Sequence, residues 1–147
     1  MKKRNLFLAA LMALSVISSY SPAYAQEKMG ACSQREKIAV KKHISGQISA
    51  LGKSNWQSAY NYAALAFQQT VPLDYFKEII TKQYFYLISN DGYTFGDCTK
   101  TPDGINQFLT VNYHGAKRIL LYGLTVVDKR LGIAGASEAK TSTGVAA

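Results

Sequence analysis

The sequence has little cysteine, histidine or proline, with two, two and three residues of each among 147. Two cysteines and two well-separated histidines are too few for a Cys-rich zinc site or a disulfide-dense scaffold, although acidic side chains gathered in space remain an alternative metal site. The motifs H-E-x-x-H and G-x-S-x-G are absent, as is a glycine-rich phosphate loop after a strand. Outside the first 25 residues, no apolar run reaches the ~18 residues of a membrane-spanning helix. The sequence therefore suggests no metal, no cofactor and no stable membrane anchor.

The first 25 residues have the pattern of a cleaved secretory signal. A basic start, Met1–Arg4, precedes an apolar stretch from Leu6 to Ile17. Ala23-Tyr24-Ala25 supplies the small residues that signal peptidase needs, so the mature chain is expected to begin at Gln26 and to be periplasmic or secreted. An uncleaved anchor and a lipoprotein modified at Cys32 are the alternatives.

The composition of the remaining chain fits one globular domain. Hydrophobic residues make up 48% and charged residues 18% of the sequence, which is too apolar for a disordered chain. We expect a single domain over 26–136 and a disordered, small and polar tail over 137–147.

The formal net charge of +8 belongs partly to the signal, which contributes three basic residues. The other basic residues cluster at Lys37, Lys41 and Lys42, at Lys117-Arg118 and at Lys129-Arg130. A nucleic-acid surface has a larger basic face with interleaved aromatic residues. We therefore interpret these clusters as solvated surface and expect no nucleic-acid partner, with weak attraction to anionic lipid or polysaccharide as the alternative.

Export would place Cys32 and Cys98 in an oxidising compartment, where they can form one intramolecular disulfide. The alternative is a free, buried Cys98 with Cys32 on a frayed terminus. Neither cysteine has a histidine within a few residues, so the sequence gives no support for a nucleophilic role.

Three amphipathic segments follow the signal. Residues 35–52 place apolar side chains at helical spacing and end at Gly52, and the stripe consists of Val40, Ile44, Ile48 and Leu51. Ser54 and Gln57 resemble a capping box, which predicts a second helix carrying Trp56, Tyr60, Ala63 and Phe67. Pro72 suits the first position of a third helix, whose stripe is Leu73, Phe76, Ile80, Tyr84 and Leu87.

Short alternating segments fill the second half and predict strands over 93–98, 107–113, 118–127 and 131–136. His114-Gly115 has the length of a two-residue hairpin turn. Segment 118–127 is apolar enough to be buried on both faces. Helices followed by an antiparallel meander indicate an α+β fold, in which the N-terminal helices pack on one face of a curved antiparallel sheet.

The helical half of the chain has three patterns of spaced apolar and aromatic residues: Ile44-x-x-Gln47-Ile48-x-Ala50, Trp56-x-x-Ala59-Tyr60-x-Tyr62-Ala63 and Phe76-x-x-Ile79-Ile80-x-x-x-Tyr84. These patterns resemble those of an uncharacterised bacterial family, the domain of unknown function 4864. The resemblance covers residues 40–136. The final strand keeps Ile133 and Gly135 of the family pattern but has Leu131 where the family has Trp. The resemblance implies a cystatin-like or nuclear-transport-factor-two-like cone, in which a bent sheet wraps a helix, and implies no activity.

Cones of this kind often enclose an apolar cavity, and the chain has ten Tyr and six Phe. An aromatic-lined cavity would suit a flat or acyl ligand, whereas the alternative interpretation is an aromatic-rich core. The candidate pocket residues are Trp56, Tyr60, Phe67, Tyr84, Phe95 and Tyr113.

Because a catalytic constellation is missing, the sequence favours a non-enzymatic binding module for an apolar small molecule or a protein partner. A small hydrolase or isomerase is the alternative, with Asp97 or Asp103 as the acid and Tyr93 or Tyr113 as the hydrogen-bond donor. Both aspartates lie beside turn residues, where Asp is common for structural reasons. His43 and His114 are expected to be solvated. A third hypothesis is a structural protein that forms a homodimer through its sheet.

Overall fold

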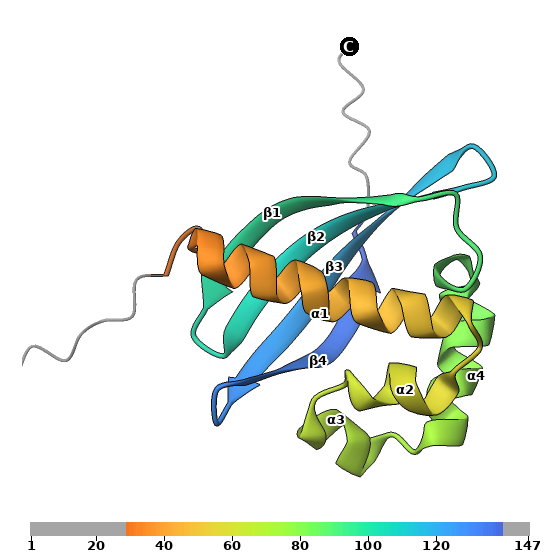
Figure 1. Ribbon diagram of the computed structural model, residues 1–147, viewed down its shortest axis with the longest axis horizontal. Helices are drawn as coiled ribbons and strands as arrows, with labels where there is room; N and C mark the ends of the chain where they lie inside the picture. Colours follow the sequence, from red (N-terminus) through yellow and green to blue (C-terminus); the bar gives the residue numbers. More distant parts are fainter. Residues whose placement is uncertain (1–28, 140–147) are drawn as a thin grey trace, which may run out of the picture.

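A computed structural model describes residues 29–139 of the chain. Four α-helices and a short 3-10 helix precede four strands, and the strands form one antiparallel sheet in the order β1-β2-β3-β4. Helix α1 crosses one face of the sheet, while α2, α3 and α4 gather near the end of α1, on the β4 side of the sheet (Figure 1). This arrangement confirms the α+β prediction. The predicted signal and most of the predicted tail lie outside the described residues.

The long helix α1 (Gln34–Gly52) confirms the first amphipathic segment. Its stripe, Val40, Ile44, Ile48 and Leu51, is at most 4% exposed and forms the centre of the core. Ser33 caps the helix through a capping box, in which its hydroxyl accepts from the Glu36 N–H and Glu36 accepts from the Ser33 N–H. At the other end, Gly52 is the last helical residue, and the left-handed residue is Ser54 with a φ of 54°.

The prediction of a single second helix is wrong. It is divided into α2 (Trp56–Asn61) and α3 (Leu65–Thr70), and the residues between them pair with β4. The Ala64 N–H donates to the Ile133 carbonyl at 2.8 Å, and the Ile133 N–H donates to the Tyr62 carbonyl at 2.9 Å. The predicted capping box is also wrong, because Asn55 rather than Ser54 caps α2, with its side chain accepting from the Ser58 N–H.

The third predicted helix corresponds to α4 (Leu73–Gln83) and the 3-10 helix η1 (Phe85–Leu87). Pro72 is the N-cap rather than the first helical residue. Phe76, Ile80 and Leu87 are buried, and Leu73 and Tyr84 pack against the core with part of their surface exposed.

The sheet contains β1 (Tyr93–Thr101), β2 (Gly104–Tyr113), β3 (Ala116–Val127) and β4 (Arg130–Glu138). Both later hairpins have two left-handed turn residues, which match the right-handed twist of the strands: φ is 48° and 78° at His114 and Gly115, and 50° and 62° at Asp128 and Lys129. β4 runs to Glu138, two residues beyond the predicted strand, so the start of the predicted tail is strand.

The sequence predicted that β3 is buried on both faces, and this prediction is wrong. Leu120, Tyr122 and Leu124 are buried against the helices, whereas the alternate residues Ile119 and Leu121 on the opposite face are partly exposed. Residues of a strand point alternately to the two faces of the sheet, and the described helices cover only one of them. The apolar run in the sequence therefore marks a strand with one covered face.

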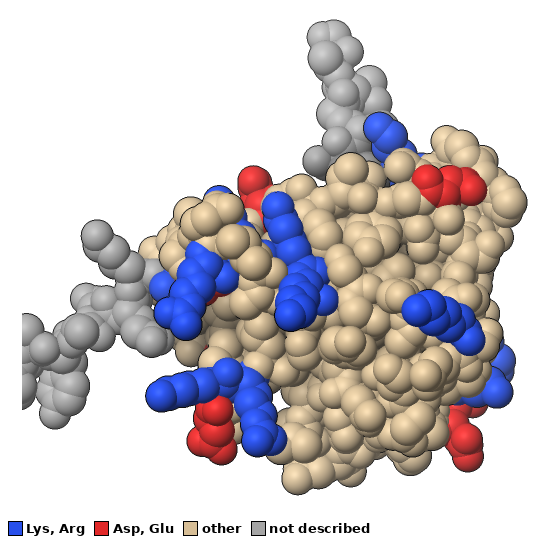
Figure 2. Space-filling view, viewed as in Figure 1, with Lys and Arg blue, Asp and Glu red and all other residues tan. Residues whose placement is uncertain are grey.

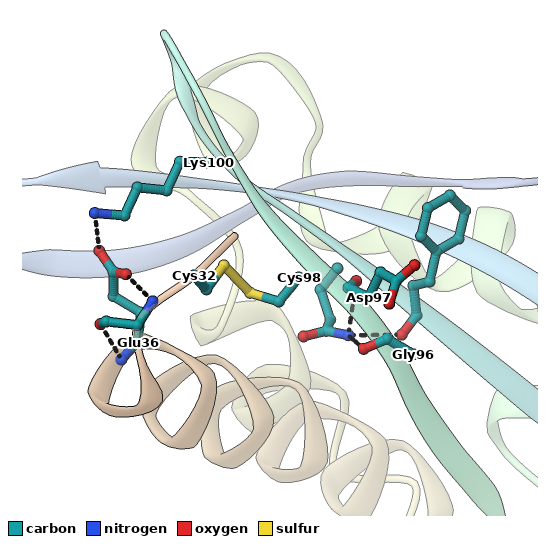
Figure 3. Close-up of a disulfide and its surroundings, with 9 residues drawn as sticks. Cys32, Glu36, Gly96, Asp97, Cys98 and Lys100 are labelled. Carbon is teal, nitrogen blue, oxygen red and sulfur yellow. Dashed lines mark hydrogen bonds and ion pairs between the residues drawn. A yellow bond between two sulfur atoms is a disulfide. The ribbon is translucent and has the colours of Figure 1, made fainter. Parts of the chain in front are cut away.

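The disulfide Cys32–Cys98 joins the segment before α1 to β1 (Figure 3). Both cysteines are buried, and the described chain contains no free cysteine. The Cys32 N–H donates to the Cys98 carbonyl at 3.0 Å, and the Lys100 N–H donates to the Gly30 carbonyl at 2.7 Å. A short piece of chain is thus added to the outer edge of β1 and fixed there covalently.

Candidate functional site

An apolar cleft of about 350 Å³ lies between α4 and the last two strands. Helix α4 packs mainly on α2 and η1 rather than directly on the strands, which leaves space between it and the sheet. The helical side contributes Phe67, Phe76, Ile79, Ile80, Tyr84 and Leu87, and the sheet contributes Tyr122, Ile133, Gly135 and Ala136. The cleft volume is near the lower end of the ~300–1,000 Å³ that holds small organic ligands.

The lining of the cleft contains no charged side chain among the described residues. Its polar groups are amides and phenols: Gln47, Gln83, Tyr75, Tyr84 and Tyr122. The Tyr84 hydroxyl donates to the Ala136 carbonyl at 2.7 Å, which ties the end of α4 to β4 beside the cleft. Gln47 is 4% exposed, and its side-chain nitrogen donates to the Ala59 carbonyl at 3.4 Å.

Tyr122 is the most deeply buried phenol of the cleft, with 1% of its surface exposed. It lies on β3 opposite Gln107 of β2 and Ala136 of β4, on the face that the helices cover. Burial raises the pKa of its hydroxyl, with smaller contributions from Tyr84 and Tyr93, so the group is a protonated donor at neutral pH. The hydroxyl has no hydrogen-bond partner within residues 29–139.

Two of the six predicted pocket residues, Phe67 and Tyr84, line this cleft. Tyr60 is a core residue whose hydroxyl donates to the carbonyls of Gln68 and Val71. Trp56 is half-buried, with the Lys77 ammonium 5.4 Å from its ring centroid.

The remaining two predicted pocket residues lie elsewhere on the sheet. Phe95 packs edge-on against Tyr93, and the Lys41 ammonium lies 5.7 Å from its ring centroid. Tyr113 contacts Phe85 edge-on, with ring centroids 5.4 Å apart. The six aromatic residues therefore do not form one pocket.

The groups considered for acid–base chemistry are also dispersed. Asp97 is exposed on a bulge of β1, and Asp103 is exposed in the turn between β1 and β2. Neither aspartate lines the cleft, and neither do Tyr93 and Tyr113. Among residues 29–139, no Asp or Glu side chain lines the cleft.

Of the two histidines, His114 is exposed in its turn as expected. The expectation for His43 is wrong, because its Nε2 lies 2.8 Å from the Tyr62 carbonyl and its ring packs edge-on against Tyr62. A carbonyl only accepts, so Nε2 carries the proton in this contact. His43 thus helps to hold the connection between α2 and α3. Residues 29–139 contain no cluster of three His, Cys, Asp or Glu side chains able to hold a metal ion.

A second crevice, of about 240 Å³, lies between α1 and the β1 bulge and is lined by Lys37, Lys41, Asp97 and Gln107 among others. Gln107 is fully buried, and its nitrogen donates to the carbonyls of Gly96, Asp97 and Phe108 (Figure 3). Because the bulge removes these carbonyls from the hydrogen-bond ladder between the strands, the bonds from Gln107 satisfy them, and Gln107 has a structural role. On the face of the molecule that Figure 2 shows, the Lys and Arg side chains are surrounded by broad uncharged surface.

The two buried polar residues of the cleft, Tyr122 and Gln47, were not among the predicted site residues. Tyr122 shares the inward face of β3 with Leu120 and Leu124, and Gln47 lies on the buried stripe of α1 beside Ile44 and Ile48. A polar residue within an apolar stripe was the available signal in both cases.

These features define the class: a small α+β protein with one long helix on an open antiparallel meander and an apolar cleft beside its last strands. A family model described as "Domain of unknown function (DUF4864)" matches residues 33–142. The chain belongs to this family, as its resemblance to the family indicated. No curated protein and no solved structure gives a significant match. No helix within residues 29–139 is long and apolar enough to cross a membrane.

Proposed function

We propose that this protein is an exported, non-enzymatic binding module that holds an apolar small molecule in the cleft between α4 and the sheet. The observation that carries the proposal is the cleft itself, with its apolar lining, its few polar groups and its volume of about 350 Å³. Open apolar clefts with a few polar groups are the usual form of small-molecule sites. The long helix held against a curved meander also supports assignment to the cystatin-like and nuclear-transport-factor-two-like folds.

Export is supported by two independent features. The first 25 residues have the three parts of a signal sequence, and the Cys32–Cys98 disulfide is of a kind that persists in oxidising compartments. N-terminal sequencing of the protein produced in a bacterial host with a secretion pathway tests this. A mature chain that begins at Gln26 is expected, and a chain that retains Met1 would contradict export by this signal.

The binding proposal is tested by thermal shift and native mass spectrometry of the mature chain with neutral aromatic and medium-chain acyl compounds. We expect saturable one-to-one binding and a rise in the unfolding temperature. Ala136→Phe fills the cleft, because Ala136 shares the inward face with Tyr122, and this variant should lose both signals.

Ala134→Phe is the matched control, because Ala134 is exposed on the same strand and does not line the cleft. This variant should bind as the parent does. Absence of binding by the parent chain across the whole set, or equal binding by both variants, would contradict the proposed site.

A further inference from the structure

Within the cleft, the phenols differ in their hydrogen bonding. The hydroxyl of Tyr84 donates to the Ala136 carbonyl at 2.7 Å, and that of Tyr86, which lies next to the cleft in η1, donates to Glu138 at 2.9 Å. The nearby core residue Tyr60 donates to two main-chain carbonyls. The Tyr122 hydroxyl, buried on the inward face of β3, is the exception, since it has no partner among the described residues.

An unpaired buried hydroxyl costs free energy, because it has lost its hydrogen bonds to water without replacing them. Native structures rarely keep such a group without a use for it. Tyr122 is itself part of the cleft lining. A molecule bound in the cleft therefore contacts the Tyr122 side chain. The hydroxyl itself is closed to solvent in the unliganded protein, so an acceptor reaches it through a local movement of the cleft side chains.

The charge of that acceptor follows from the rest of the lining. No Lys, Arg or His within residues 29–139 lines the cleft, so a carboxylate or phosphate would be buried there without a counter-ion. Burial of an unpaired ion costs far more than one hydrogen bond returns. A carbonyl or ether oxygen is uncharged, so its burial does not carry the cost of burying an unpaired ion. Gln47, on the α1 side, adds a second neutral polar group to the same cleft.

We propose that the ligand of this cleft is an uncharged, largely apolar molecule that carries a carbonyl-type oxygen and accepts a hydrogen bond from the hydroxyl of Tyr122. This inference rests on the proposed binding function and specifies the ligand class of that site. Tyr122 is then the specificity-determining residue, because it selects a ketone, ester or amide over the hydrocarbon of the same shape.

Three probes of nearly equal size separate the possibilities: 2-acetylnaphthalene, 2-ethylnaphthalene and 2-naphthoate. Their dissociation constants are measured by isothermal titration calorimetry on the mature, oxidised chain at neutral pH. We expect the ketone to bind about three- to tenfold more tightly than the hydrocarbon, which is the usual net value of one neutral hydrogen bond. The naphthoate should bind at least about tenfold more weakly than the ketone, because its charge is unpaired.

Tyr122→Phe should abolish the preference for the ketone and leave the affinity for 2-ethylnaphthalene within about twofold, since the ring is kept. Retained hydrocarbon binding also shows that the variant is folded. Tyr113→Phe is the matched control: it removes a phenol that does not line the cleft, and it should keep the preference for the ketone.

Equal affinity for ketone and hydrocarbon, or a preference that survives Tyr122→Phe, would overturn this inference while leaving the proposed binding function in place. Tightest binding of the naphthoate would overturn the claim that the ligand is neutral. Failure of all three probes, together with failure of the wider set of compounds described above, would count against the binding function itself.

Discussion

At the scale of single residues, nearly all buried side-chain polar atoms within residues 29–139 have a hydrogen-bond partner. Gln107 holds three carbonyls around the β1 bulge, and His43 holds the Tyr62 carbonyl. Only two buried side-chain atoms among the described residues lack a partner, Gln107 Oε1 and the Tyr122 hydroxyl. The first belongs to an amide whose nitrogen is fully used, whereas the second is the sole polar atom of its side chain. The cleft lining thus includes one side chain with an unsatisfied hydroxyl.

Tyr122→Phe should therefore increase the stability of the ligand-free protein. Removing the unpaired hydroxyl removes its desolvation cost, so the free energy of unfolding should rise by about 1 kcal/mol. Tyr84→Phe removes the satisfied hydrogen bond to the Ala136 carbonyl and should lower the same quantity by about 1 kcal/mol. Urea denaturation followed by circular dichroism measures both. A loss of stability in Tyr122→Phe would mean that the hydroxyl has a partner.

Glu36 is expected to titrate below its usual range. Its carboxylate accepts from Lys100, with Nζ and Oε1 2.9 Å apart, and from the Ser33 N–H, and these bonds lower its pKa. A lowered folded-state pKa stabilises the protein above the unfolded-state value of about 4.3 and this contribution is lost as the pH falls through the folded-state pKa.

Lys100→Met should raise the Glu36 pKa toward its ordinary value, as measured by NMR titration of the side-chain carboxyl. The stability difference between the parent and this variant should disappear at low pH, where Glu36 is protonated in both. Lys77→Met is the control, because Lys77 lies over the Trp56 ring and is not an ion-pair partner of Glu36. An unchanged Glu36 pKa in Lys100→Met would show that the ion pair does not form in solution.

At the scale of elements, helical periodicity predicted α1 and α4 because each buries a continuous stripe of its own. It failed between Trp56 and Phe67, where the spacing continues but the helix does not. The break is caused by Ile133, 70 positions along the chain from Ala63, whose backbone pairs with Tyr62 and Ala64. No local pattern reports such a contact. An apolar cavity was expected, but most of its lining was not predicted for the same reason, because the cleft is bounded by α4 and by strands that are distant in sequence.

Gly132 is required for this contact between β4 and the α2–α3 connection. A Cβ at Gly132 would lie 2.6 Å from the Cα of Ala64, which is backbone and cannot swing away. Gly132→Ala should therefore lower the free energy of unfolding by about 1–3 kcal/mol, the usual cost of overpacking. It should also expose the amides of Ala64 and Ile133 to hydrogen exchange.

Gly135→Ala is the matched control on the same strand, because a Cβ there meets nothing within 4 Å. Its effect on stability should stay within about 0.5 kcal/mol, as for most open positions. Equal effects of the two substitutions would indicate that the connection does not pack on β4 as the structure places it.

At the scale of the whole molecule, the open sheet has both outer strands partly covered. Residues Gly30–Cys32 pair with the second half of β1, and Tyr62–Ala64 pair with the first half of β4. Unpaired strand edges invite association between chains, so such covers favour the monomeric fold. The segment that pairs with β4 has a helix on either side of it in the chain. The segment that pairs with β1 lies close to the first described residue and depends on the disulfide to stay in place.

The disulfide should accordingly dominate the stability of the whole domain. It closes a loop of 66 residues, for which the chain-entropy model gives about 4 kcal/mol. The double variant Cys32→Ala with Cys98→Ala should lose about this amount of unfolding free energy. The fully reduced parent should behave in the same way, and this comparison separates the effect of the cross-link from the effect of the substitutions.

Hydrogen exchange should show the amides of Cys32 and Lys100 losing protection before those of α1, because the stripe of α1 remains buried without the cross-link. Equal denaturation midpoints for oxidised and reduced protein would show that the cross-link contributes no stability and would contradict this prediction.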